Sequence, residues 1–261
     1  MPSAARWSSS CCVTAERVGH DSVLCHADLV RLTVTDTAEA AATAAARAIA
    51  RRLATAVRDR GRASVAFSGG STPLAMFRAL AGMRLAWDRI DVFQVDERCA
   101  PDGDRDRNAT MLIELLIKPT GIDRRAVRLM PVTMADTAVA ARRYGALVAA
   151  TEPFDVVHLG LGSDGHTASW PPADTVIDAV EPVAYSGEYQ GRTRMTLTPG
   201  VVNRARSRVV LAAGADKAPI IERWFAGDPA LPICRVRRSA TAVFIDRAAA
   251  GRSSLLDRLN G

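Results

Sequence analysis

The feature that most constrains this fold is a recurring order, in which a short apolar segment runs into a polar loop and a helical segment follows. Three such apolar segments cover residues 63–67, 90–95 and 154–161, and reactive side chains follow each of them. Strands that alternate with helices predict an α/β fold, with a mostly parallel sheet covered by helices on both faces. Ligands bind such sheets outside the carboxyl ends of the strands, so we expect the functional site there.

Weaker patterns complete this order. Asp36 is expected to cap a long alanine-rich helix that Gly61 ends. Further strands are predicted over residues 28–35, 127–132, 194–198, 208–213 and 242–246, and helices over 36–60, 74–82, 109–117, 135–150 and 216–225, with a short helix between 198 and 208. No repeat or linker interrupts the order, so we expect one domain over residues 28–261, preceded by a flexible leader at 1–27.

The charge of the chain favours an anionic ligand. The 261 residues carry a formal net charge of +6, almost all of it on arginine, because Lys118 and Lys217 are the only lysines. The arginines stand singly or in pairs, without the dense basic run interleaved with aromatic residues that nucleic-acid binding favours. We therefore expect a small anionic molecule as the ligand and no nucleic-acid partner.

The cysteines predict a reduced, cytoplasmic protein without structural zinc. They are odd in number and lack the spacing of metal ligands: Cys11, Cys12, Cys25, Cys99 and Cys234. No apolar run reaches the roughly 18 residues of a membrane span, and the first residues lack the apolar core of a secretory signal. A membrane partner is therefore not expected.

The first reactive loop, SGGSTP at residues 68–73, has the composition of a phosphate cradle. Gly69 and Gly70 allow close approach of the backbone, while Ser71 and Thr72 add hydroxyl donors at the start of a helix. The alternative is an ordinary strand-to-helix turn in which Thr72 is the N-cap. The lysine of a Walker loop is missing.

The second loop, GSDGHT at residues 162–167, places Asp164 and His166 on either side of a glycine. A carboxylate that orients an imidazole leaves the other ring nitrogen available as a general base. The alternative is a surface loop in which His166 is incidental. His158 lies inside the apolar strand, and we interpret it as a core histidine with its hydrogen bonds satisfied.

Two further positions carry charge near strand ends. Asp96 and Arg98 follow the strand at 90–95 and offer a carboxylate and a cation for a polar ligand, although a solvated charged turn is the alternative. Lys217 follows a strand and a glycine in VVLAAGADK, in a chain that otherwise uses arginine. A lysine there favours a site that needs a compact point charge.

Taken together, SGGSTP, VDER, GLGSDGHTAS, the RMTLT–VVN–AR stretch and GADKA resemble, in this order, the glucosamine-6-phosphate isomerase/6-phosphogluconolactonase family. The resemblance runs from about residue 28 to the C-terminus and is strongest to the lactonases. It implies a single-domain, modified Rossmann-like sandwich similar to glucosamine-6-phosphate deaminase and ribose-5-phosphate isomerase. It also implies hydrolysis of 6-phospho-D-glucono-1,5-lactone to 6-phospho-D-gluconate in the pentose phosphate pathway, by a monomer or small homo-oligomer, without metal or organic cofactor.

The resemblance also implies roles for individual residues. His166 is the general base that activates water, and Asp164 orients or polarises it. Asp96 and Arg98 contact the sugar or its developing negative charge. The implied phosphate-binding residues are Gly69, Gly70, Ser71, Thr72 and Lys217, assisted by Arg194 or Arg206. The chain departs from the family at Arg107, where serine is common, and at Trp170-Pro171, where Leu-Phe is usual, which affects the shape of the sugar pocket.

Two alternative functions remain at this point. A glucosamine-6-phosphate deaminase shares both loops, but its pattern has a glutamate five residues after the histidine, where this chain has Pro171, and a tyrosine where it has Arg98. Proline has no group that can relay a proton. A non-catalytic sugar-phosphate-binding protein is the other alternative, and it normally needs an output module that is not evident here.

Overall fold

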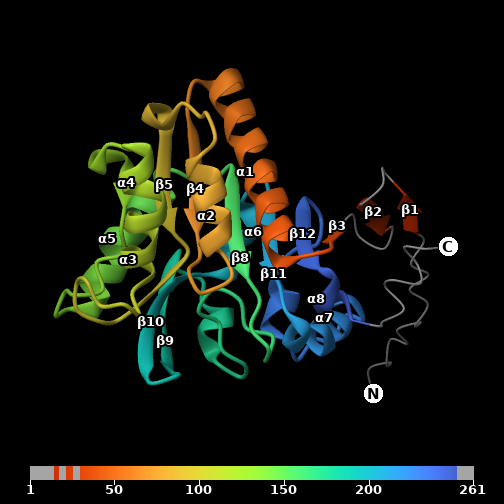
Figure 1. Ribbon diagram of the computed structural model, residues 1–261. Coiled ribbons are helices and arrows are strands. Elements are labelled where there is room, and N and C mark those ends of the chain that lie inside the picture. Colours follow the sequence, from red (N-terminus) through yellow and green to blue (C-terminus); the bar gives the residue numbers. More distant parts are fainter. Residues whose placement is uncertain (1–14, 18–21, 26–29, 252–261) are drawn as a thin grey trace, which may run out of the picture.

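The computed structural model of the chain describes residues 15–17, 22–25 and 30–251. Its larger sheet has nine strands (Figure 1). In spatial order these are β1 (Ala15–Arg17), β2 (Ser22–Cys25), β3 (Val30–Thr35), β12 (Thr241–Asp246), β11 (Arg208–Ala212), β8 (Val156–Gly160), β4 (Ala63–Phe67), β5 (Ile90–Gln94) and β7 (Val127–Arg128). All pairs from β3 to β7 are parallel, whereas β1 and β2 add antiparallel. The predicted mostly parallel sheet is confirmed.

The chain reverses its direction of travel across the sheet between β4 and β8. From β4 it moves outward to β5 and β7, and it then returns to the other side of β4 as β8 before moving to β11 and β12. Loops that leave neighbouring strands toward opposite faces open a crevice between them, which is where open α/β sheets bind ligands. The two reactive loops at residues 68–73 and 162–167 follow these two strands.

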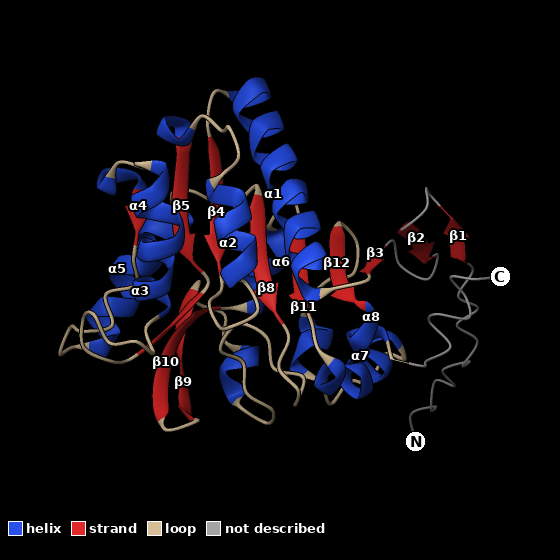
Figure 2. Cartoon of the chain, in the orientation of Figure 1, coloured by secondary structure: helices blue, strands red, loops and turns tan. Residues whose placement is uncertain are grey.

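Helices cover both faces of the sheet, as predicted, and Figure 2 shows α1 (Ala38–Arg60) and α2 (Leu74–Ala81) in front of the strands. Their apolar residues share one core with Val209 and Leu211 of β11. The alternate residues Val210 and Ala212 face a second core. Helices α5 (Thr137–Ala149), α6 (Pro199–Arg204), α7 (Ala218–Phe225) and α8 (Arg247–Ala250) pack there.

The long helix α1 begins one residue later than expected. Thr37, not Asp36, is its N-cap, since Thr37 Oγ1 accepts a hydrogen bond from Ala40 N at 3.1 Å. Asp36 instead forms an ion pair with Arg247. Gly61 ends the helix in a left-handed conformation with φ +78°, as predicted.

A second, three-stranded antiparallel sheet is the largest departure from the prediction. It contains β6 (Asp96–Arg98), β10 (Arg192–Leu197) and β9 (Val183–Tyr189), in that order. The charged triplet of β6 was predicted as a loop, and β9 was not predicted because it lacks an apolar run. Figure 1 shows the β9–β10 hairpin projecting past the carboxyl ends of β4 and β8, so this sheet forms a wall beside the loops that follow these strands.

Several predicted boundaries also shift. The strand expected at 127–132 is the short β7, and the helix expected at 109–117 divides into α3 (Asn108–Leu112) and a π-helical segment, Ile113–Ile117. The helix expected at 216–225 starts with a 3-10 turn, Ala215–Lys217, before α7. The predicted leader lies outside the described residues except for β1 and β2. Within the part of the chain that the structure describes, no helix has the length and apolarity needed to cross a membrane.

Candidate active site

Polar loops from four neighbouring strands meet at one edge of the sheet. Strands β11, β8, β4 and β5 are adjacent and parallel, so their carboxyl ends share that edge. The predicted residues that follow these strands there are Lys217 after β11, Asp164 and His166 after β8, Gly69 to Thr72 after β4, and Asp96 and Arg98 after β5. Neighbouring strands lie about 4.8 Å apart, so the set spans roughly 15 Å, about the length of a sugar phosphate with its contacts.

The loop at 68–73 is open toward an anion. Ser68 N donates to His158 O of the neighbouring strand at 3.2 Å, but the next four backbone N–H groups, those of Gly69, Gly70, Ser71 and Thr72, donate no hydrogen bond among the described residues. Gly70 has φ +107°, which favours glycine. Pro73, not Thr72, is the N-cap of α2, and no side chain caps this helix. Thr72 is therefore not the N-cap that the ordinary-turn alternative expects, and unpaired donors remain for a ligand.

Asn108 fixes the position of this loop. Its side chain occupies the space beside Gly69, where an added Cβ would lie only 2.0 Å from Asn108 Oδ1. The same side chain donates from Nδ2 to the carbonyl of Asp96 at 2.9 Å. Gly69 is therefore required for close packing of the loop against α3.

Asp164 and His166 form a hydrogen-bonded pair. Asp164 Oδ1 lies 2.6 Å from His166 Nδ1 and also accepts from the His166 backbone N–H at 3.1 Å. Gly165 has φ +87°, which makes the tight turn between them. A Cβ at Gly162 would lie 1.9 Å from His166 Nδ1, so a glycine at this position leaves room for the imidazole.

The carboxylate of Asp164 is held in its charged form. Burial disfavours the charge, but hydrogen bonds from Tyr189 and His166 outweigh it and place the pKa of Asp164 below its usual value. The Tyr189 hydroxyl donates to Asp164 Oδ2 at 2.5 Å. A charged Asp164 holds the proton of His166 on Nδ1, and no described group bonds to Nε2. His166 thus leaves its Nε2 without a partner among the described residues.

Two arginines face each other on the adjoining wall. Arg98 of β6 and Arg194 of β10 are direct register partners, and each has a buried Nε without a hydrogen-bond partner. Burial and the charge of Arg98 lower the pKa of Arg194. Opposed like charges with unused donors are unfavourable on their own, so this pair suits an anionic or oxyanionic ligand.

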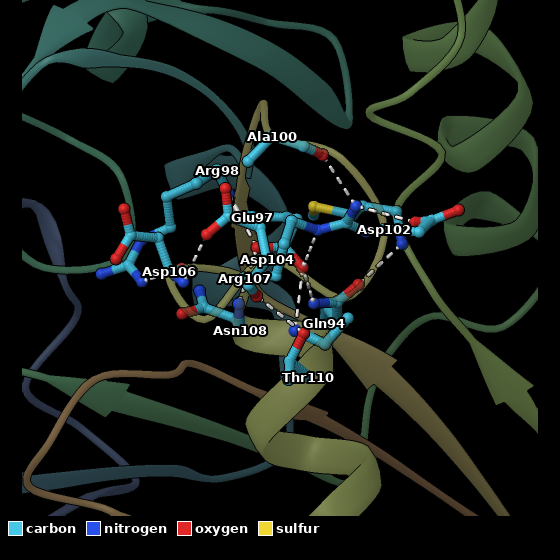
Figure 3. A network of polar contacts seen from close by, with 12 residues as sticks. Gln94, Glu97, Arg98, Ala100, Asp102, Asp104, Asp106, Arg107, Asn108 and Thr110 are labelled. Carbon is cyan, nitrogen blue, oxygen red and sulfur yellow. Dashed lines mark hydrogen bonds and ion pairs between the residues drawn. The ribbon is translucent and has the colours of Figure 1, made fainter.

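The two carboxylates of β6 are not exposed to solvent. Asp96 is 4% exposed and accepts from Ser68 Oγ at 2.9 Å and Ser169 Oγ at 2.8 Å, which ties the loops after β4 and β8 together. The alternative that places Asp96 in a solvated turn is wrong. Glu97 is fully buried, and Figure 3 shows it at the centre of a polar network with Arg107 and the first residues of α3. We interpret both as residues that organise the site.

Arg206 is not brought to this edge. It precedes β11, and its guanidinium lies 3.4 Å from Asp155, which precedes β8. The amino ends of the parallel strands form the opposite edge of the sheet, so the prediction that Arg206 assists phosphate binding is wrong. Lys217 is at the carboxyl edge, where its Nζ lies 2.9 Å from Asp216 Oδ2 and its side chain is 16% exposed.

Two residues of this site, Tyr189 and Ser169, were not predicted from the sequence. Tyr189 contacts Asp164 only because β9 pairs with β10, and no local pattern signals that contact. His158 is a core residue, as expected, and both of its ring nitrogens are buried. Burial lowers the pKa of His158 to about 3. The described residues contain no cluster of three metal-binding side chains.

The chain is similar to known proteins in both sequence and fold. Residues 36–245 match the family described as glucosamine-6-phosphate isomerases/6-phosphogluconolactonase. A 6-phosphogluconolactonase of Rhizobium meliloti is 36% identical over 207 residues, covering 76% of this chain and 89% of that protein. The solved 6-phosphogluconolactonase of Trypanosoma brucei has a TM-score of 0.75 at 27% identity and covers 84% of this chain and 97% of its own. A monomeric glucosamine-6-phosphate deaminase with a TM-score of 0.76 at 19% identity, over 85% and 99% of the two chains, shows the shared fold alone.

Proposed function

The chain belongs to the glucosamine-6-phosphate isomerase/6-phosphogluconolactonase family, and from this premise we propose that it is an enzyme that hydrolyses 6-phospho-D-glucono-1,5-lactone to 6-phospho-D-gluconate. This is a step of the oxidative pentose phosphate pathway. The observation that carries the proposal is the Asp164–His166 pair, whose Nε2 has no partner among the described residues, in the loop after β8 and next to the glycine loop after β4. The relatives named as 6-phosphogluconolactonases support the same reaction.

His166 acts as the general base. Its Nε2 takes a proton from water while the water oxygen forms a bond to the lactone C1 carbonyl carbon. The bond between C1 and the ring oxygen then breaks, and the imidazolium returns the proton to that oxygen, which becomes the C5 hydroxyl. Asp164 holds the ring and stabilises the imidazolium between the two proton transfers.

The phosphate lies on the loop of Gly69, Gly70, Ser71 and Thr72, whose free N–H groups lie before α2. Lys217 approaches from β11, separated from this loop by the single strand β8. Arg98 and Arg194 lie on the wall beside these loops, where their positive charges stabilise the negative charge that develops on the carbonyl oxygen. Asp96 supports these loops through Ser68 and Ser169.

Deamination of glucosamine 6-phosphate is the competing activity within the family. A ring-opening and isomerising enzyme needs a further titratable group beyond the base, and the position five residues after His166 is Pro171. Hydrolysis needs only one base and one activated water, and the residues present supply the base. The lactonase reaction is therefore the better match.

A comparison of three substrates tests the proposal. Freshly generated 6-phospho-D-glucono-1,5-lactone is followed in a pH-stat, with spontaneous hydrolysis subtracted, beside glucosamine 6-phosphate and unphosphorylated D-glucono-1,5-lactone. We expect fast loss of the first, no turnover of the second and much slower loss of the third, because the phosphate contacts orient the substrate. Turnover of glucosamine 6-phosphate, or a lactone rate equal to background, contradicts the proposal.

The setting of the reaction is part of the same proposal. Cys99 and Cys234 are free thiols, which supports a reducing, cytoplasmic compartment. The ligand is a phosphorylated sugar lactone rather than nucleic acid, and the enzyme works as a monomer or small homo-oligomer.

A further inference from the structure

The tip of the β9–β10 hairpin touches the proposed catalytic pair from outside its own loop. Tyr189, the last residue of β9, donates its hydroxyl proton to Asp164 Oδ2 at 2.5 Å, and its oxygen lies 3.1 Å from His166 Nδ1. The rings of Tyr189 and His166 meet edge to face, with centroids 5.3 Å apart. Asp164 therefore has one oxygen bound to the imidazole and the other bound to the phenol.

The backbone of the hairpin places Tyr189 there. Gln190 and Gly191 form a two-residue turn with φ +51° and +75°, the signs that a tight hairpin with right-handed strand twist requires. Tyr189 and Arg192 pair directly across this turn. A short, well-defined turn allows little movement of the phenol away from Asp164.

Arg194 and Gln190 hold the tyrosine in turn. The Arg194 guanidinium lies over the Tyr189 ring, 5.0 Å from its centroid. Arg194 Nη2 donates to Gln190 Oε1 at 3.1 Å, and Gln190 Nε2 donates to the Tyr189 oxygen at 3.1 Å. A continuous chain of contacts thus runs from a buried arginine of the wall to the imidazole.

We infer that Tyr189 is a positioning residue of the enzyme, which fixes the Asp164 carboxylate so that His166 keeps the geometry and tautomer of a general base. The role deepens the proposed lactonase function and rests on it. Burial and the hydrogen bond to Asp164 raise the pKa of Tyr189 to about 12, so the phenol stays a neutral donor throughout the working pH range. Arg194 couples the charge of a bound ligand to the same chain of contacts.

The matched pair Tyr189→Phe and Tyr185→Phe tests this role. Both tyrosines lie on β9, but the Tyr185 hydroxyl is buried without a hydrogen-bond partner. Each variant is measured for lactone kcat and KM, for unfolding temperature, and for the low-field proton signal of His166 Nδ1–H, assigned by its absence from His166→Gln. We expect Tyr189→Phe to lower kcat about tenfold, the effect of one lost hydrogen bond to a charged group, and to change KM less than about twofold.

The spectrum gives a readout that does not depend on turnover. Tyr189→Phe shifts the His166 proton signal, whereas Tyr185→Phe leaves kcat, KM and the signal at wild-type values. Unchanged kcat and an unchanged signal in Tyr189→Phe overturn the inference, and so does a loss of kcat that follows a loss of folded protein. If the wild type has no lactonase activity the proposed function fails, and the His166 signal alone then decides whether Tyr189 orients the pair.

Discussion

His158 and His166 lie on one strand and the loop that follows it, yet their surroundings give them opposite properties. His166 has a charged carboxylate on one ring nitrogen, and no described residue bonds to the other. His158 is fully buried against Phe67 and Phe77, and burial lowers its pKa to about 3. One imidazole is available to react and the other is kept neutral inside the core.

The neutral His158 predicts a loss of stability in mild acid. An unfolded histidine has a pKa of about 6.5, so between about pH 6.5 and pH 3 the unfolded chain binds a proton that the folded chain does not. Stability therefore falls as the pH drops through this window. Between pH 7 and pH 5, this histidine lowers the free energy of unfolding by about 2 kcal/mol.

Urea unfolding of the wild type and His158→Leu at both pH values measures this effect. For each protein, the free energy of unfolding at pH 5 is subtracted from that at pH 7, so the packing cost of the substitution cancels. We expect the wild type to lose about 2 kcal/mol more than the variant. Equal losses show that His158 is not the group responsible.

At the scale of elements, the sequence predicted strands with long apolar runs well and missed those held by distant contacts. β4 matches its predicted range, and β8 and β11 lie within theirs, because each is buried on both faces. The charged residues of β6 and the polar residues of β9 form no apolar run that would predict a strand. These two strands form because β10 pairs with both of them. Tyr189 was missed with β9. Arg206 was wrongly assigned even though it precedes the strand predicted at 208–213, which already places it at the amino edge of the sheet.

Two glycines at the end of β8 give a prediction at this scale. A methyl group at Gly162 would collide with His166 Nδ1, whereas Gly160 has nothing within 4 Å of the same position. Gly162→Ala is therefore expected to displace the imidazole and to lower kcat for the lactone by more than about tenfold. A displaced base is no longer within hydrogen-bond distance of the reacting water. Gly160→Ala is the control, measured in the same assay. Similar kcat values for the two variants contradict the geometry of the Asp164 loop.

At the scale of the whole molecule, the topological switch between β4 and β8 turns separate motifs into one site. The alternation of strands and helices was enough to predict this edge as the site. It did not predict the second sheet that provides Arg98 and Arg194 as a facing pair, because antiparallel register cannot be read from either strand alone.

Binding of the product is expected to stabilise the whole fold through these loops. At a concentration one hundred times its Kd, 6-phospho-D-gluconate adds about 2.7 kcal/mol to the free energy of unfolding. Lys217→Ala removes a cation at the site edge and reduces this gain. Lys118→Ala is the matched control, because Lys118 pairs with Glu114 on the surface. Thermal unfolding with and without product measures both, and an equal gain in the two variants excludes Lys217 from the phosphate site.

The central claim is that His166 is the base in a lactone-hydrolysing site, and the rate of lactone loss with His166→Ala beside the wild type tests it most directly. Freshly generated 6-phospho-D-glucono-1,5-lactone is followed in a pH-stat after subtraction of spontaneous hydrolysis. A positioned general base contributes about 10²–10⁴-fold, so we predict a fast wild type and a variant slower by at least the lower figure. A variant that keeps the wild-type rate contradicts the claim.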